Sequence, residues 1–470
     1  MRFSTLKAVL LASALSAPFP GSAQTQDDVA ALRAEIARLK AELDSMEARL
    51  GRVEAGQSSQ TSAALPVSDR PATGVSAQTS LASPAPSPVP AAKPETQITW
   101  RGAPQFSNDG GFSFKPRGRL QMDSNVVSRP DGINAPTLGW SADVRRAYLG
   151  VDGKLGGGLG YRLELDFASG NAQFTDAWLT YDRGPLTLTL GHHRITTLED
   201  LTSDLEGSFL ERAAFTQAFG FERRLGLSAN YRFGDVQLSA GMFADDLAAL
   251  GASGVTSNSY AFDARLVFMP KVGGSQLHFG GSAHHRELND LSNVVQYRAR
   301  PGARTTDIRF VDTGLFSASS ETGYGLEFAA LHGRWHLAAE GFWQQVARPG
   351  LADPTFFGGY GEMGYVIAGA AGRGYRNGAF GSIKPIRGID KGGAGAWQVN
   401  LRYDWLDLED DLIGGGRQQT FGASLVWVPI ERVKFLANYL RVEVSDTPVV
   451  AGTLDDYSSN VFGLRAQYEF

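Results

Sequence analysis

From Phe112 to the C-terminus, apolar side chains alternate with polar and charged ones along many short segments. The last segment shows this best: one face carries Phe462, Leu464, Ala466, Tyr468 and Phe470, and the other carries Gly463, Arg465, Gln467 and Glu469. A side-chain period of two is typical of β-strands with two unlike faces. The same alternation recurs at residues 161–167 and 397–404, so the sequence predicts an all-β fold.

The connections between the predicted strands alternate in length. Every second connection is short: 156–158, 183–185, 234–235, 270–274, 332–334 and 429–431. The intervening connections are mostly longer, as at 124–142, 193–221, 245–258, 286–320 and 444–457. About 16 strands with short turns at one end and long loops at the other are typical of a bacterial outer-membrane barrel. We therefore predict a transmembrane antiparallel β-barrel over residues 96–470.

A soluble β-sandwich is the alternative, because it also pairs one apolar face with one polar face in each strand. The repetition over so many strands and the aromatic residues at strand ends favour the barrel. The chain also ends on an aromatic strand with Tyr468 and Phe470. Such a strand resembles the signal by which the barrel-assembly machinery recognises outer-membrane proteins.

Three different compositions precede the predicted barrel. Residues 1–23 combine a basic start, a short apolar run and small residues at 21–23, which predicts a signal peptide. Residues 24–55 place apolar side chains at steps of three and four, which predicts a short periplasmic coiled-coil helix. A single amphipathic helix on the barrel or membrane is the alternative. Residues 56–95 are rich in Pro, Ser and Ala and are predicted to be an extended linker.

Composition narrows the classes of function. The net charge of -5 gives no sign of a nucleic-acid partner. The mean hydropathy of -0.18 suits a barrel, in which only alternate residues face lipid. His192 with His193, and His284 with His285, are candidate bases or metal ligands. Because no Cys, serine elbow or helical His–Glu spacing accompanies them, we predict no enzyme, no metal site and no cofactor.

Short motifs spread over most of the predicted barrel carry a family resemblance. They include RRAYLGV at 145–151, GYRLELDF at 160–167, LEDLTS at 198–203, FLER at 209–212, RRLG at 223–226 and GAWQ at 395–398. Their order and spacing together resemble the phosphate-selective porin O and P family. The chain departs from that family after Gly191, where it has His192, His193 and Arg194 in place of the usual Phe-Lys pair.

The resemblance implies a trimeric barrel of the outer membrane that lets small anions, including phosphate or polyphosphate, diffuse passively. Its partners would be membrane lipids or lipopolysaccharide, copies of itself and the assembly machinery, with the N-terminal segment in the periplasm. It further implies that loop 193–221 folds inward and that segment 368–394, which is too long for a short turn, is an infolded periplasmic turn. A porin for other solutes, or a barrel that tethers the outer membrane to the cell wall, are the alternatives.

Fixed positive charge inside a narrow pore would select anions. The predicted pore-lining and constriction residues are Arg146, Arg162, Arg194, Arg212, Arg223, Arg232, Arg265, Arg373, Arg376, Lys384, Arg387 and Arg402. The alternative is that these arginines pair with carboxylates of neighbouring strands and only stiffen the wall. Loop 193–221 is acidic overall, which opposes anion selectivity.

Overall fold

The structure is a computed structural model that describes residues 96–470 apart from 101, 134, 221–222, 246–258, 289–292, 411–412 and 450–453. The chain divides into two units, Met1–Val89 and Pro90–Phe470, and every described residue belongs to the second. The predicted signal peptide (1–23), coiled coil (24–55) and linker (56–95) lie outside the described residues and remain predictions.

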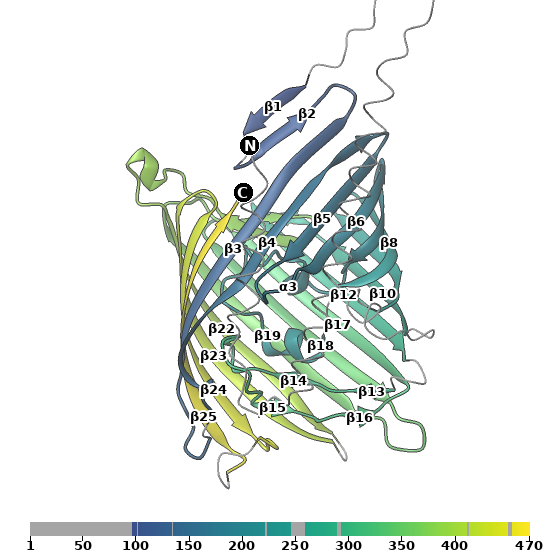
Figure 1. Ribbon diagram of the computed structural model, residues 1–470, viewed down its shortest axis with the longest axis vertical. Coiled ribbons are helices and arrows are strands. Elements are labelled where there is room, and N and C mark those ends of the chain that lie inside the picture. Colours follow the sequence, from purple (N-terminus) through teal and green to yellow (C-terminus); the bar gives the residue numbers. More distant parts are fainter. Residues whose placement is uncertain are drawn as a thin grey trace, which may run out of the picture. The chain divides into compact units, whose positions relative to one another are not determined.

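The described unit is built on a closed antiparallel sheet (Figure 1). Neighbouring strands in the sequence pair with each other, and β25 pairs with β3 to close the barrel. Sixteen strands form the ring: β3 (Phe112–Val127), β4 (Gly139–Gly156), β5 (Leu159–Asp166), β6 (Gln173–Arg183), β7 (Leu186–His193), β8 (Arg224–Phe233), β9 (Val236–Phe243), β10 (Tyr260–Phe268), β12 (Ser275–Glu287), β17 (Ser320–His332), β18 (Trp335–Ala347), β19 (Thr355–Ala368), β22 (Ala396–Asp410), β23 (Ile413–Ile430), β24 (Val433–Ser445) and β25 (Tyr457–Glu469). The predicted barrel of about 16 strands is confirmed.

Shorter elements extend or fill this ring. The strands β1 (Gln97–Trp100) and β2 (Pro104–Ser107) continue the sheet from the start of β3, and β11 (Lys271–Val272) pairs with β12. Three small two-stranded sheets pair β13 (Val294–Val295) with β16 (Phe316–Ser317), β14 (Arg298–Ala299) with β15 (Val311–Asp312), and β20 (Arg373–Arg376) with β21 (Ala379–Ile383). The described helical segments are α3 (Leu198–Leu201), α4 (Ala214–Ala218) and the 3-10 turn η1 (Ile389–Lys391).

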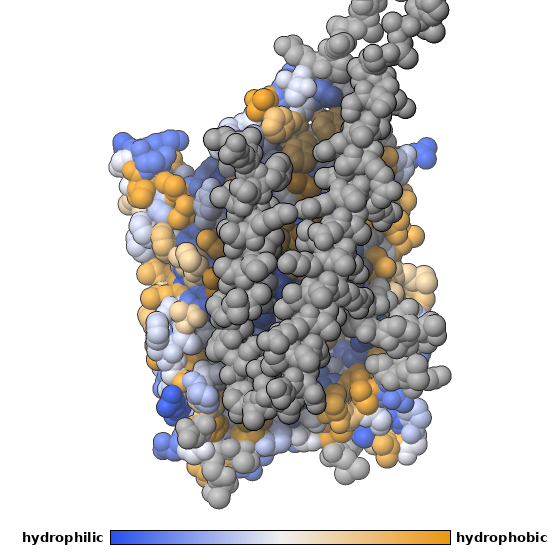
Figure 2. Space-filling model, in the orientation of Figure 1, coloured by the Kyte–Doolittle hydropathy of each residue, from blue (hydrophilic) through white to orange (hydrophobic). Residues whose placement is uncertain are grey.

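The wall of the barrel is polar inside and apolar outside. On β22, Leu401 is 57% exposed and Tyr403 38%, whereas Arg402 is 6% and Asp404 3% exposed. Figure 2 shows hydrophobic side chains along the outer wall. A soluble sandwich would bury the apolar face, so the sandwich alternative is wrong. None of the described helical segments has the length and apolar composition needed to cross a membrane.

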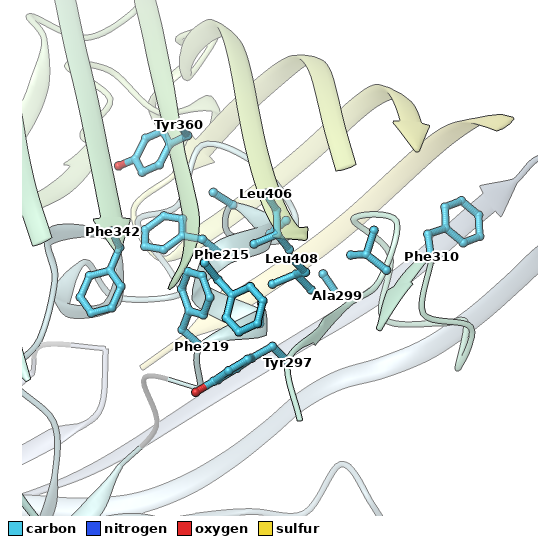
Figure 3. Close-up of a cluster of buried hydrophobic side chains, with 14 of the residues drawn as sticks. Phe215, Phe219, Tyr297, Ala299, Phe310, Phe342, Tyr360, Leu406 and Leu408 are labelled. Carbon is cyan, nitrogen blue, oxygen red and sulfur yellow. The ribbon is translucent and has the colours of Figure 1, made fainter. Parts of the chain in front are cut away.

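Two long connections fold into the barrel and pack there around a hydrophobic core. Phe215 and Phe219 come from the connection between β7 and β8, and Tyr297 comes from the connection between β12 and β17. The ring of Phe219 lies 5.7 Å from that of Tyr297 and 5.8 Å from that of Phe342 on β18 (Figure 3). Phe215 is fully buried. Since burying one such side chain stabilises by roughly 1.5–3 kcal/mol, the core holds both connections firmly against the wall.

The C-terminal residue takes part in closing the barrel. The pairing of β25 with β3, which we call the barrel seam, runs from Val461–Val127 to Glu469–Arg119. Beyond it, the Phe470 N–H donates to the Gly118 carbonyl at 3.1 Å, and the Gly118 N–H donates to the Phe470 carbonyl at 3.3 Å. The Phe470 ring covers Gly118 so closely that a methyl group there would lie 2.2 Å from it.

Deleting Phe470 should therefore weaken barrel closure and outer-membrane insertion. The deletion removes two backbone hydrogen bonds, which together contribute roughly 1–3 kcal/mol, and also the ring. Phe470→Ala keeps both hydrogen bonds and should lose less stability. The change is measured as heat-modifiable electrophoretic mobility of the membrane fraction. Equal mobility and yield for the deletion, the Ala variant and the parent would contradict this role of the seam.

Candidate functional site

A cavity of about 780 Å³ lies between the inward-folded connections and the wall around β4 to β6. Of the described residues, twelve arginines line it: Arg145, Arg146, Arg194, Arg212, Arg223, Arg298, Arg300, Arg304, Arg309, Arg373, Arg402 and Arg465. Six acidic residues line it with them: Asp166, Glu199, Asp200, Asp204, Glu211 and Glu362. The lining therefore has a formal excess of six positive charges, and its organisation depends on which arginines are already paired.

Asp204, in the connection between β7 and β8, is the meeting point of three arginines. Its carboxylate lies 2.7 Å from Arg212, 3.1 Å from Arg146 on β4 and 3.3 Å from Arg119 on β3. Burial raises the pKa of Asp204, but Arg146, Arg212 and Arg119 outweigh burial and hold this pKa well below its usual value. The carboxylate is thus ionised and fastens the connection to the wall.

Glu211 docks the same connection across the seam where β25 pairs with β3. Arg145 on β4 binds its carboxylate through two nitrogens at 2.6 and 2.9 Å, and Arg465 on β25 lies 3.2 Å away. Arg465 also forms a bidentate pair with Asp123 on β3. Bidentate arginine–carboxylate pairs combine charge with fixed geometry, so this acidic residue holds the connection in place.

Two more wall residues bind this connection through its main-chain carbonyls. Arg402 on β22 donates to the Glu211 carbonyl at 3.1 Å and stacks 4.3 Å from the centre of the Phe209 ring. Lys434 on β24 donates from Nζ to the Leu205 carbonyl at 3.0 Å and also to that of Gly207. The Asp204 and Glu211 carboxylates of segment 193–221 are thus neutralised by basic wall residues. This pairing reduces the repulsion of anions that the acidic composition of the segment led us to expect.

A second group of arginines comes from the connection between β12 and β17. Arg298, Arg304 and Arg309 form no ion pair with any residue that the structure describes, and Arg309 buries Nε and Nη1 without a hydrogen-bond partner among those residues. Arg300 lies 3.8 Å from Asp307, whose side chain is 87% exposed. Burial and the neighbouring Arg309 and Arg304 lower the pKa of Arg300 to about 10, so it stays charged at neutral pH.

The segment between β19 and β22 contributes an inward hairpin, β20–β21. Arg373 donates to the Ser208 hydroxyl at 2.9 Å and to the Glu206 carbonyl at 2.6 Å, and it pairs with Glu362 on β19 at 3.3 Å. The Phe380 N–H donates to the Thr202 hydroxyl at 3.3 Å. The hairpin thus contacts the connection between β7 and β8 inside the barrel, as the family resemblance implied.

Arg265 on β10 fixes the tip of this hairpin. It is 1% exposed, donates to the Gly378 carbonyl at 2.9 Å, and pairs with Glu327 on β17 through contacts of 2.6 and 2.9 Å. Next to it, His278 on β12 hydrogen-bonds the Tyr375 hydroxyl at 2.6 Å. The hairpin is therefore anchored at its tip by a buried ion pair that bridges two strands.

The structure divides the predicted site residues into two groups. Those that line the cavity are Arg146, Arg194, Arg212, Arg223, Arg373 and Arg402, and those that do not are Arg162, Arg232, Arg265, Arg376, Lys384 and Arg387. Arg162 pairs with Asp176 at 3.5 Å and stacks on Trp178, and Arg232 hydrogen-bonds Gln237. Pairing within the wall, the alternative interpretation, thus holds for Arg162.

The remaining three predicted residues, Arg376, Lys384 and Arg387, are exposed and outside the cavity. Arg373 and Phe380 of the hairpin line the cavity, whereas Lys384 and Arg387 follow the hairpin in the chain and do not. Sequence reasoning also missed the arginines at 298, 300, 304 and 309. Four arginines within twelve residues of a long loop were the signal that pointed to them.

The predicted histidine pairs lie in hydrogen-bonded surroundings. His192 contacts the Thr175 carbonyl at 2.8 Å, and His193 contacts the Ser228 hydroxyl at 2.6 Å. His284 lies against the Asp263 carboxylate. Among the described residues, no group of three or more His, Asp or Glu side chains is arranged to hold a metal ion.

Arg265→Met should destabilise the barrel and loosen the hairpin. Removing one partner of a buried pair leaves Glu327 uncompensated and costs about 3–5 kcal/mol. Arg265→Met combined with Glu327→Gln should recover part of the stability but not the hydrogen bond to Gly378. The midpoint of denaturant unfolding measures the first effect, and single-channel conductance in planar bilayers measures the second. A double variant no more stable than the single one would contradict the assigned role of the pair.

Comparison with known proteins agrees with the resemblance in the sequence. The family model "Phosphate-selective porin O and P" matches residues 114–470. An uncharacterized protein of Caulobacter vibrioides is 42% identical over 478 residues, covering 99% of this chain and 96% of that protein. Porin O of Pseudomonas aeruginosa is 26% identical over 414 residues, covering 77% of this chain and 90% of that protein.

Among solved structures, OmpT, an outer membrane protein of Vibrio cholerae, matches with a TM-score of 0.50 at 10% identity. The match covers 77% of this chain and 98% of that one, and it shows a shared fold alone. The family match spans most of the barrel, including the cavity and both inward-folded connections. This chain therefore belongs to the phosphate-selective porin O and P family.

Proposed function

We propose that this outer-membrane porin passes small anions by passive diffusion, with phosphate and polyphosphate as the favoured solutes. The observation that carries the proposal is the excess of arginine over carboxylate in the cavity lining. Fixed positive charge in a narrow channel of low dielectric constant attracts anions and repels cations. The family and the closed barrel support a channel as opposed to an enzyme.

The unpaired arginines make phosphate a suitable solute. A guanidinium group offers several N–H donors in a planar fork that matches phosphate oxygens. The arginines that dock the connection between β7 and β8 have their donors occupied by Asp204 and Glu211. Arg298, Arg304 and Arg309 form none of these contacts, and the exposed Arg298 and Arg304 can exchange water for a passing oxyanion. They supply the charge on which the proposed selectivity rests.

The assembly and orientation belong to the same proposal. The short turns would face the periplasm, together with the N-terminal segment, and the long connections would face the outside. Three copies would associate, with the predicted coiled coil at residues 24–55 supporting the trimer. The lipid-facing wall would contact phospholipid and lipopolysaccharide after insertion by the barrel-assembly machinery.

Arg304→Glu combined with Arg309→Glu should move selectivity from anions toward cations. Four units of charge change at the lining, and a shift of about 1.4 kcal/mol in relative barrier heights changes the permeability ratio roughly tenfold. Reversal potential under a salt gradient measures the ratio, and phosphate added to chloride solution should block current in the parent only. Arg183→Glu with Lys271→Glu makes the same charge change at exposed positions outside the cavity and should have little effect. A cation-selective parent would overturn the proposal.

Anion selectivity should also fall as pH rises. Burial raises the pKa of Glu199 to about 7, against the opposing effects of Arg402, Arg212 and the Ala213 N–H. A carboxyl group with a raised pKa is neutral below it and negative above it. The cavity therefore gains one negative charge between about pH 6 and pH 8.

Glu199→Gln should keep the anion-to-cation permeability ratio constant across this range, near the acidic value of the parent. Glu443→Gln, an exposed change on the outer wall, should leave the pH dependence unchanged. The ratio is again obtained from reversal potentials, at several pH values and constant ionic strength. An identical pH profile for Glu199→Gln and the parent would assign the titration to another group.

A further inference from the structure

Residues 384–394 form a lobe outside the barrel that the proposed pore does not use. They follow the inward hairpin and precede β22, and they contain η1. In Figure 1 this lobe projects beyond the wall at the end of the barrel that carries the short turns. A methyl group on Gly388 would lie 3.1 Å from both the Pro429 carbonyl and the Ile430 side chain, so the lobe leaves the barrel beside the turn between β23 and β24.

The lobe combines exposed apolar and basic side chains. Ile386 is 76% exposed and Ile389 51%, and the basic residues Lys384, Arg387 and Lys391 are also exposed. Asp390 is the single acidic residue of the segment, which leaves a formal charge of +2. Figure 2 shows hydrophilic side chains at the outer end of this lobe and hydrophobic ones beneath them, toward the level of the barrel wall.

Aromatic side chains fix the height at which the lobe leaves the wall. The ring of Trp427 lies 5.2 Å from that of Trp397 and 5.4 Å from that of Phe435, in a stacked row on the outer face. Both indole N–H groups donate to the Ala394 carbonyl at 3.0 Å. Aromatic girdles of barrels lie at the boundary between lipid tails and headgroups. The lobe therefore continues an existing lipid-facing surface at headgroup level.

We propose that residues 384–394 anchor the barrel to the leaflet at its short-turn end by binding anionic phospholipid headgroups. Ile386 and Ile389 enter the region between headgroups and acyl chains, and Lys384, Arg387 and Lys391 contact the phosphate groups. Basic residues beside an inserted apolar surface are attracted to anionic lipid. Contact between the lobes of two copies fits less well, because it would bring like charges together. The proposal is independent of which solute the pore passes.

The depth of the lobe can be measured because the chain contains no cysteine. A nitroxide attached after Ile389→Cys reports membrane depth through its relative accessibility to oxygen and to a water-soluble nickel chelate. The reference is Leu351→Cys, which lies in the connection between β18 and β19 and has nearly the same exposed fraction, 53%. In vesicles of phosphatidylcholine with phosphatidylglycerol, the label at 389 should be oxygen-accessible and protected from nickel, whereas the label at 351 should not.

The basic residues are tested by their response to anionic lipid. Raising the phosphatidylglycerol fraction should increase nickel protection at 389, and Lys384→Gln with Arg387→Gln and Lys391→Gln should abolish that increase. Lys154→Gln with Arg183→Gln and Lys271→Gln removes three exposed basic residues at the same end of the barrel and should preserve it. Each charge near an anionic surface changes binding roughly fivefold, so the difference between the two triple variants is large.

Three results would overturn the proposal. The first is equal nickel accessibility at 389 and 351 in every lipid mixture. The second is spin–spin broadening between labels at 389 of neighbouring copies, which would assign the lobe to contact between subunits. The third is a response to phosphatidylglycerol that is unchanged when Lys384, Arg387 and Lys391 are replaced by Gln, or that inorganic phosphate in solution reproduces without the lipid.

Discussion

Backbone hydrogen bonding in lipid leaves a membrane-spanning sheet no free edge. Here the last strand meets the first over the register from Val461–Val127 to Glu469–Arg119, and Phe470 extends the seam to Gly118. Closure turns one face of every strand toward lipid and the other toward the lumen. The alternation of side chains along each strand then determines which residues reach the interior. The rest of the structure depends on how the charged side chains among them are paired.

The buried arginines of the interior require carboxylate or other polar partners. An arginine removed from bulk water loses hydration, and a nearby carboxylate compensates for that loss. The wall supplies some of the carboxylates, such as Asp123 for Arg465, and the connection between β7 and β8 supplies others, such as Asp204 and Glu211. That connection is acidic because it lies against a basic wall. Of the described cavity arginines, Arg298, Arg304 and Arg309 have no ion pair, and all three come from the connection between β12 and β17, so in the proposed porin an inserted loop carries the charge offered to solutes.

The fold was predictable from the sequence because its signals are local. A period of two within each strand and the alternation of short and long connections gave the barrel without reference to distant contacts. The pairing of arginines was not predictable, since Arg119 meets Asp204 and Arg465 meets Asp123 across large sequence separations. Segment 368–394 shows the same limit. Its Gly-rich, basic composition is alike throughout, yet Arg373 enters the lumen and Lys384 and Arg387 stay outside.

The packing inside the barrel also bears on how selection works. Phe215, Phe342 and Leu406 are at most 1% exposed, although they lie inside the lumen of a channel. Displacing either inward-folded connection would expose several such side chains at a cost of roughly 1.5–3 kcal/mol each, besides breaking buried ion pairs. Thermal motion therefore seldom moves these connections as whole units. If the proposed channel is narrowest at these connections, discrimination between solutes depends on the positions and ionisation of charged side chains such as Glu199 and the cavity arginines without an ion pair.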